Sequence, residues 1–206
     1  MIKKIIILIL IVLPGFLSCY DALDTYENGI AYNLRDRGPA GGWIFYINPN
    51  YKADGWRYLE AAPVETEWSG KRWSTNITTS IVTSTGVGSG KANTSAIVTY
   101  LNSIGESDRA AQLCDSLVYG GYSDWFLPSA DELKEMCWVL YSMKYDSVDN
   151  PAYGSNRVGG FQIYYYWSSS EDSLTLASVC RFSSGEMTTA PKGTTSDQYV
   201  RAIRAF

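Results

Sequence analysis

The chain has 206 residues, with 17 Lys and Arg against 21 Asp and Glu, and its formal net charge at pH 7 is −4. This balance argues against the clustered basic surface that nucleic-acid binding requires, so no nucleic-acid partner is expected. The sequence has no histidine, which excludes Ser-His-Asp and Cys-His catalytic groups and histidine-ligated zinc.

Residues 1–18 have the features of a bacterial export signal. Two lysines precede an unbroken apolar run at 5–13, which is too short to span a membrane. Cys19 follows Leu-Ser and resembles the lipidated cysteine of a lipobox. We therefore expect a lipoprotein signal peptide over 1–18 and an acyl (palmitate) anchor on Cys19, with an ordinary signal peptide as the alternative. Tyr20 follows that cysteine in place of an inner-membrane retention aspartate, which favours the outer membrane or cell surface.

The segment after Cys19 divides into a tether and a domain. Residues 19–40 are polar and weakly patterned, which predicts a lipidated tether. Residues 41–206 are long enough to form one domain with a sizeable core. Within it, the β-branched and aromatic run at 43–47 predicts a strand, and 56–61 predicts its partner.

The next segment, 74–94, is rich in Thr, Ser and Gly and predicts a loop. It contains GVGSGK at 86–91, which is similar to part of a phosphate-binding loop. Thr85 stands where a Walker loop needs its first Gly, and Ala92 stands where it needs Ser or Thr. These departures exclude a nucleotide site here.

Three helices are predicted in the middle of the chain. The first is short and capped by Asn93 or Thr94, and the second covers 107–117. The third follows GGYSDWFLP and opens with a Ser-x-x-Glu capping box at 129–132, which makes this stretch a structural corner.

The remainder predicts a long loop at 144–160 and then strands separated by short turns. These strands are expected at 161–167, 174–182, 186–189 and 199–206. Helices in the middle with strands at both ends predict an α+β fold with an antiparallel sheet, in which the terminal strands pair.

Aromatic rings beside neutral polar groups suggest a carbohydrate site, since pyranose faces are apolar and their rims carry hydroxyls. The candidate ligand-binding residues are Asp124, Trp125, Tyr166, Trp167, Ser168, Ser169, Ser170 and Glu171. In the alternative interpretation, the rings belong to the core and the serine hydroxyls satisfy backbone groups at a strand end. No catalytic residues are assigned, and no enzymatic activity is expected.

No cofactor is expected either. Acidic and amide side chains in the 144–160 loop make Ca²⁺ the alternative, although their spacing does not match an EF-hand. With Cys19 assigned to lipid, Cys114, Cys137 and Cys180 remain. We expect them to be buried free thiols, with a bridge involving Cys180 as the alternative.

Six segments occur in an order that resembles the C-terminal domain family of the Legionella collagen-like adhesin, over about 41–206. They are GWIFY at 42–46, LEAAP at 59–63, GVGSGKANT at 86–94, GGYSDWFLPSADEL at 120–133, YWSSSE at 166–171 and VRAIR at 200–204. The resemblance implies a C-type-lectin-like fold with a small twisted sheet, two main helices and a long loop region. It also implies binding of sulfated glycosaminoglycans and trimeric assembly.

We therefore expect a lipid-anchored, non-enzymatic envelope protein whose domain binds a glycan or host-matrix ligand as an adhesin, with oligomerisation left open. One alternative is a structural envelope protein that acts through protein contacts. Another is an oxidase similar to formylglycine-generating enzymes, which need two nearby cysteines late in the chain, where only Cys180 lies.

Overall fold

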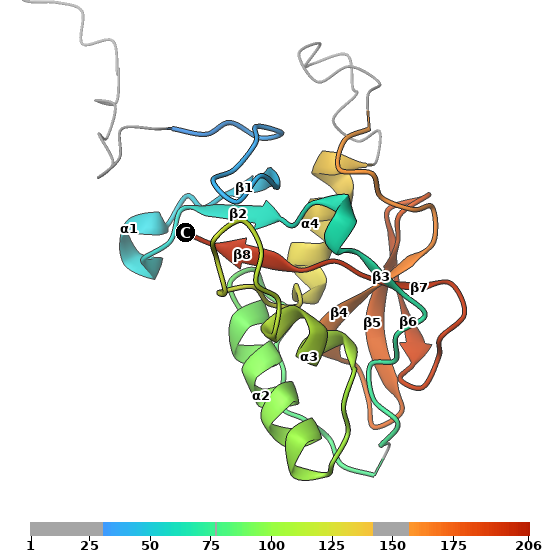
Figure 1. The fold of residues 1–206 in the computed structure, drawn as a ribbon. Helices are drawn as coiled ribbons and strands as arrows, with labels where there is room; N and C mark the ends of the chain where they lie inside the picture. The colour runs from blue at the N-terminus through green and yellow to red at the C-terminus, as the bar shows by residue number, and fades with distance from the viewer. Residues whose placement is uncertain (1–30, 77, 142–156) are drawn as a thin grey trace, which may run out of the picture. The chain divides into compact units, whose positions relative to one another are not determined.

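The computed structural model describes residues 31–76, 78–141 and 157–206, and Tyr32–Phe206 form one compact unit (Figure 1). The expected signal peptide, Cys19 and most of the 144–160 loop lie outside the described residues. The final part of the expected tether belongs to the compact unit, because Arg35 N donates to Ile44 O at 2.8 Å. The folded unit therefore begins before residue 41.

A small sheet contains the first two strands. β1 (Trp43–Ile47) and β2 (Tyr58–Ala61) pair antiparallel, as predicted, on either side of the short helix α1 (Tyr51–Asp54). The third strand of this sheet is β8 (Ile203–Ala205), in the order β1-β2-β8. The C-terminal strand therefore pairs with β2, and the expected pairing of the terminal strands with each other is wrong.

A larger sheet has the strand order β3-β7-β4-β5-β6. Its strands are β3 (Trp68–Ser69), β4 (Tyr165–Glu171), β5 (Leu176–Arg181), β6 (Glu186–Pro191) and β7 (Gln198–Val200). All neighbours pair antiparallel except β4 and β7, which are parallel. The single terminal strand predicted at 199–206 is in fact two strands, one in each sheet, because the chain between them pairs instead with Ala62, whose N–H donates to Ala202 O.

The helices are α2 (Gly90–Ser103), α3 (Ala110–Asp115) and α4 (Ala130–Leu140), with a 3₁₀ turn, η1, at Val64–Thr66. The capping box at the start of α4 is confirmed. The predicted cap of α2 is wrong, because that helix begins at Gly90, after the N-cap residue Ser89, and contains Asn93 and Thr94 in its first turns. Both side chains are buried and bond to backbone carbonyls, Asn93 to Ser84 O and Thr94 to Leu127 O.

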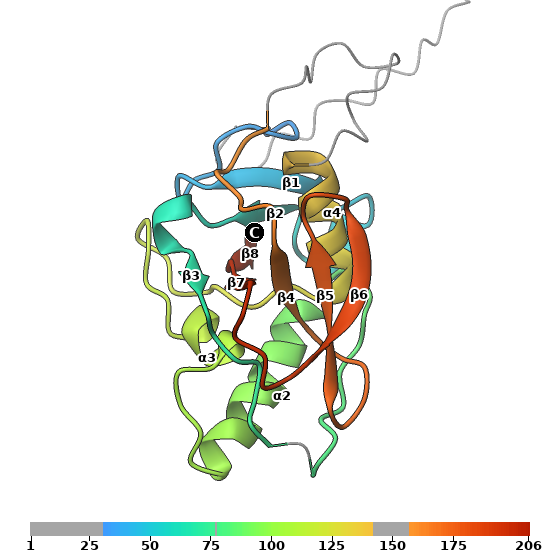
Figure 2. The ribbon, with the colours of Figure 1, turned by 90° about the vertical axis from the view of Figure 1, so that its right-hand side faces the viewer.

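Strands β4 and β5 lie between two apolar clusters of buried side chains. Figure 2 shows β4, β5 and β6 side by side in the larger sheet. Trp167 and Val179 point to a cluster shared with α2 and α3, while Tyr166 and Cys180 point to a cluster shared with α4 and the small sheet. This alternation follows from the two-residue period of a strand, and it requires both faces to be apolar. The result confirms the α+β class. The C-type-lectin-like arrangement stays a prediction. Among the helices of the described residues, none has the length and hydrophobicity of a membrane-spanning segment.

The Glu106 carboxylate joins the turn after α2 to the loop at 74–76. It accepts from Thr75 N at 3.0 Å and from Arg109 Nε at 2.6 Å. Burial alone would raise the pKa of Glu106, but its hydrogen bonds outweigh burial and lower that pKa from 4.5 to about 2. The ionised carboxylate is therefore favoured in the folded chain.

We expect the free energy of unfolding to fall as the pH drops from about 4.5 to about 2. The pKa of Glu106 is lower in the folded chain than in the unfolded chain, so the ionised carboxylate stabilises the fold above this range, and the stabilisation is lost as Glu106 is protonated. Glu106→Gln is expected to cost about 1–2 kcal/mol at pH 7, after allowance for solvent screening, and to reduce this slope. Urea denaturation across a pH series measures both effects, with Glu186→Gln, an exposed change on β6, as the control. Equal slopes in the wild type and Glu106→Gln would contradict the assignment.

Candidate ligand-binding site

The structure places the ligand-binding residues expected from sequence inside the domain, with one exception. The relative exposure is 2% for Trp125 and 0% for each of Tyr166, Trp167, Ser168, Ser169 and Ser170. The Glu171 side chain is 3% exposed. Asp124 is the exception, with a side chain 36% exposed that pairs with Arg204 Nε at 2.9 Å. These residues do not form the open face that the carbohydrate interpretation requires.

The serine run is part of strand β4 and not the predicted turn. Ser168 Oγ donates to Ser178 O on β5 at 2.8 Å, and Ser170 Oγ donates to Ser84 O at 2.8 Å. The hydroxyls therefore satisfy backbone carbonyls of neighbouring segments, as the alternative interpretation proposed.

The aromatic rings beside them are core side chains with satisfied polar ends. Trp167 Nε1 donates to Lys71 O at 2.8 Å, and Tyr166 Oη donates to Glu67 Oε2 at 2.5 Å. Burial raises the pKa of Tyr166, and the Glu67 charge raises it further. Both rings are fixed within the packing, so neither presents a face to a sugar.

Glu171 belongs to a buried ion pair. Its Oε1 lies 2.7 Å from Lys192 Nζ, and the lysine side chain is 1% exposed. Oε2 accepts from Ile81 N. The ammonium also lies 4.8 Å from the centre of the Trp73 ring. Both charges are thus compensated inside the protein.

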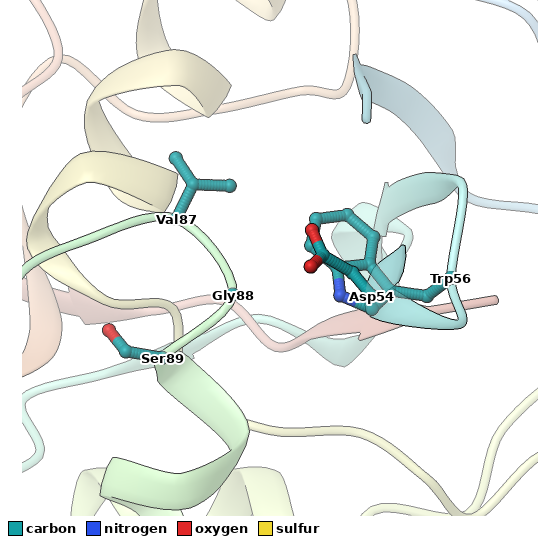
Figure 3. A pocket seen from close by; sticks show the side chains of 5 residues that line it. All are labelled: Asp54, Trp56, Val87, Gly88 and Ser89. Carbon is teal, nitrogen blue, oxygen red and sulfur yellow. The ribbon is translucent and has the colours of Figure 1, made fainter. Parts of the chain in front are cut away.

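An open pocket lies elsewhere, where the turn between α1 and β2 faces the loop that enters α2 (Figure 3). Its volume is about 360 Å³, and it is lined by Asp54, Trp56, Val87, Gly88 and Ser89. Figure 3 shows Asp54 and Trp56 on one side of the space and the loop residues on the other. This site was not predicted from the sequence, because the glycine-rich loop at 86–91 was compared only with a phosphate-binding motif. The sequence feature that could have indicated the site is Trp56, an aromatic residue next to the turn at Gly55.

Two glycines shape the loop wall of the pocket. Gly88 has φ +93°, a backbone conformation that favours glycine, and a Cβ built on it would lie at ordinary contact distance, 3.4 Å, from Trp56 Cζ2. A Cβ on Gly90 would collide with the Glu132 carboxylate. Backbone conformation therefore favours glycine at position 88, and the close approach of Glu132 requires it at position 90.

The Glu132 side chain, on α4, holds this loop through hydrogen bonds to its backbone. Its Oε1 accepts from Gly88 N at 2.8 Å, and its Oε2 accepts from Ser129 N at 2.7 Å. Burial raises the pKa of Glu132, while backbone hydrogen bonds from Ser129, Gly88 and Gly90 oppose that shift. The Glu132 side chain thus accepts from backbone N–H groups at the start of α2, where the helix dipole favours an anion.

The opposite wall combines an aromatic pair with acidic groups. The rings of Trp56 and Tyr46 lie 6.1 Å apart, and Asp54 Oδ2 accepts from Asn48 Nδ2 at 2.9 Å. Burial raises the pKa of Tyr46, and the charges of Glu135 and Asp54 raise it further. Two acidic side chains, Asp54 and Glu135, therefore act on this aromatic pair.

Comparison with known proteins gives the family. The model of the Lcl C-terminal domain matches residues 59–204, which include the loop wall of the pocket at Val87–Ser89 and all strands of the larger sheet. Asp54 and Trp56, on the opposite wall, precede the matched span. No curated protein matches the chain. The matched span covers well over half of the sequence and agrees with the ordered motifs that suggested the resemblance. The chain therefore belongs to the Lcl C-terminal domain family and contains an adhesin-like surface domain of that kind.

Proposed function

We propose that the protein is a lipid-anchored, non-enzymatic adhesin that binds a neutral or amino-bearing glycan in the pocket beside Trp56. The observation that carries this proposal is the pocket itself, in which a half-buried indole and an exposed carboxylate face a glycine-rich loop. The adhesin-like character of the family supports a binding role.

The size and chemistry of the pocket suit part of a saccharide. A volume of about 360 Å³ lies near the lower end of the range for small-ligand sites, which runs from about 300 to 1,000 Å³. The Trp56 ring offers an apolar surface for a pyranose face. Asp54 uses one oxygen for Asn48 and, as a carboxylate, keeps acceptor capacity for ligand hydroxyls or an ammonium group.

The ligand class differs from the sulfated glycosaminoglycans that the resemblance implies. Asp54 lines the Trp56 side of the pocket, the Glu135 charge acts on the neighbouring Tyr46, and Glu132 accepts from the loop that enters α2. The formal net charge of −4 adds to the repulsion of a polyanion. These charges favour neutral chains and amino sugars over sulfated chains.

We expect Trp56→Ala to weaken glycan binding about tenfold or more, because the change removes the stacking surface while the loop held by Glu132 remains. The measurement is a glycan array with neutral, amino-bearing and sulfated members, followed by titration of the mature protein. Trp138→Ala is the matched control. That indole is partly exposed on α4, lies under Lys134 and does not line the pocket.

Equal glycan affinity in Trp56→Ala and the wild type would contradict the pocket assignment, and binding restricted to sulfated chains would contradict its charge argument. If no glycan binds and cell crosslinking captures one dominant protein, the structural-protein alternative is favoured. Acylation at Cys19 is tested separately by mass spectrometry of the N-terminal peptide. An oxidase would need accessible cysteines, whereas Cys137 and Cys180 are both 0% exposed.

A further inference from the structure

Two of the three cysteines in the described residues lie in the same part of the core. Cys137 is on α4, Cys180 is on β5, and both are 0% exposed in the cluster between these elements. Cys137 Sγ donates to Phe182 O at 3.7 Å, which places this thiol against the end of β5.

The direction of the strand brings the second sulfur to the same place. Cys180 is on β5 and Phe182 directly follows the end of that strand, and both side chains are buried in the cluster that contains Cys137. The Phe182 ring packs 4.2 Å from the Tyr166 ring, and Tyr166 is opposite Cys180 in the sheet. A hydrogen bond with the Cys180 thiol and burial both raise the pKa of Cys137.

We propose that Cys137 and Cys180 form a disulfide that joins α4 to β5. Both are free thiols in the structure, buried in one cluster where α4 packs against β5, so bond formation requires the two side chains to rotate until the S–S length is about 2.05 Å. Cys114 lies in the other cluster, where burial raises the pKa of its thiol well above the usual value. Cys114 stays a free thiol.

The bond forms by thiol–disulfide exchange. The two thiols lose two protons and two electrons, and the disulfide of an envelope oxidant is reduced to two thiols after a mixed-disulfide step. Exchange needs accessible thiolates, so it occurs before the core closes around these residues. The oxidising surroundings follow from the export proposed above.

The sequence makes the pair easy to map. Trypsin places Cys137 in the peptide 135–144, Cys180 in 158–181 and Cys114 in 110–134. The mature protein is purified from the cell envelope in detergent, denatured in the presence of a thiol-alkylating reagent and digested without reduction. The expected product is the peptide 135–144 linked to 158–181, with a mass about 2 Da below the sum of the two reduced peptides, beside an alkylated 110–134.

Alkylation of both Cys137 and Cys180 would overturn the proposal, and so would a link from either to Cys114. The same digest reports the N-terminal peptide. If that peptide retains residues 1–18, the proposed export is contradicted. The cysteine pair is then tested separately, by refolding the purified chain in a glutathione–glutathione disulfide buffer. A linked 135–144 and 158–181 after refolding supports the proposal, and its absence contradicts it.

Reduction provides a second measurement. The bond closes a loop of roughly 40 residues, so Tm is expected to fall by about 5–15 °C on reduction. Cys114→Ala is expected to keep both the linked peptides and this shift, whereas Cys180→Ala loses both. An unchanged Tm on reduction of the wild type would count against the bond.

Discussion

Replacing Lys192 with methionine is expected to lower the free energy of unfolding by about 3–5 kcal/mol, because it leaves the Glu171 carboxylate charged and buried without its counter-ion. The two groups lie 2.7 Å apart, with side-chain exposures of 1% and 3%. Methionine fills a similar volume, so the loss reports charge and not a cavity. Urea denaturation followed by tryptophan fluorescence measures the change.

The exposed pair Lys71–Asp108 is the matched control. Its N···O distance is also 2.7 Å, but the two side chains are 28% and 59% exposed. Lys71→Met is expected to cost less than about 1 kcal/mol. The double variant Lys192→Met with Glu171→Gln is expected to recover part of the loss, because the amide oxygen still accepts from Ile81 N. A Lys192→Met variant as stable as Lys71→Met would show that burial does not matter at this pair.

Glu132→Ala is the second large expected effect, with a loss of about 3 kcal/mol or more. The change removes the acceptor for Gly88 N and for Ser129 N, and each buried N–H left without a partner costs about 1–3 kcal/mol. It also removes half of the capping box of α4. The variant is therefore expected to weaken both the helix start and the loop wall of the pocket.

The control for this change is the adjacent Asp131→Ala. Asp131 is exposed in the same first turn and contributes mainly through the helix dipole, about 0.3–1 kcal/mol. Hydrogen exchange at Gly88 N and Ser129 N gives a local readout, with faster exchange expected in Glu132→Ala and not in Asp131→Ala. Unchanged exchange at Gly88 N would rule out Glu132 as the residue that holds the pocket loop.

Elements with local signals were predictable from sequence. The strand at 43–47 carries a β-branched and aromatic run, and the capping box at 129–132 specifies its own helix start. The hairpin of β5 and β6 also follows from its turn residues. In each case, the residues that decide the structure lie within a few positions of it.

The site was not predictable, because long-range contacts decide it. Gly86 to Gly90 has loop composition, yet α2 starts there because Glu132, far along the chain, accepts its backbone N–H groups. Similarly, Ser168–Ser170 have turn composition, but the hydroxyls of Ser168 and Ser170 donate to the carbonyls of Ser178 and Ser84 inside the fold. Local composition carries no information about such partners.

The split strand at 198–205 has a consequence for the order of assembly. β7 pairs with β3 on one side and with β4 on the other, and β8 pairs with β2 in the small sheet. Segments synthesised early therefore remain without their neighbours until nearly the whole chain is available. A chain truncated before residue 198 would therefore lack one strand of each sheet, and both sheets would be left incomplete by the same deletion.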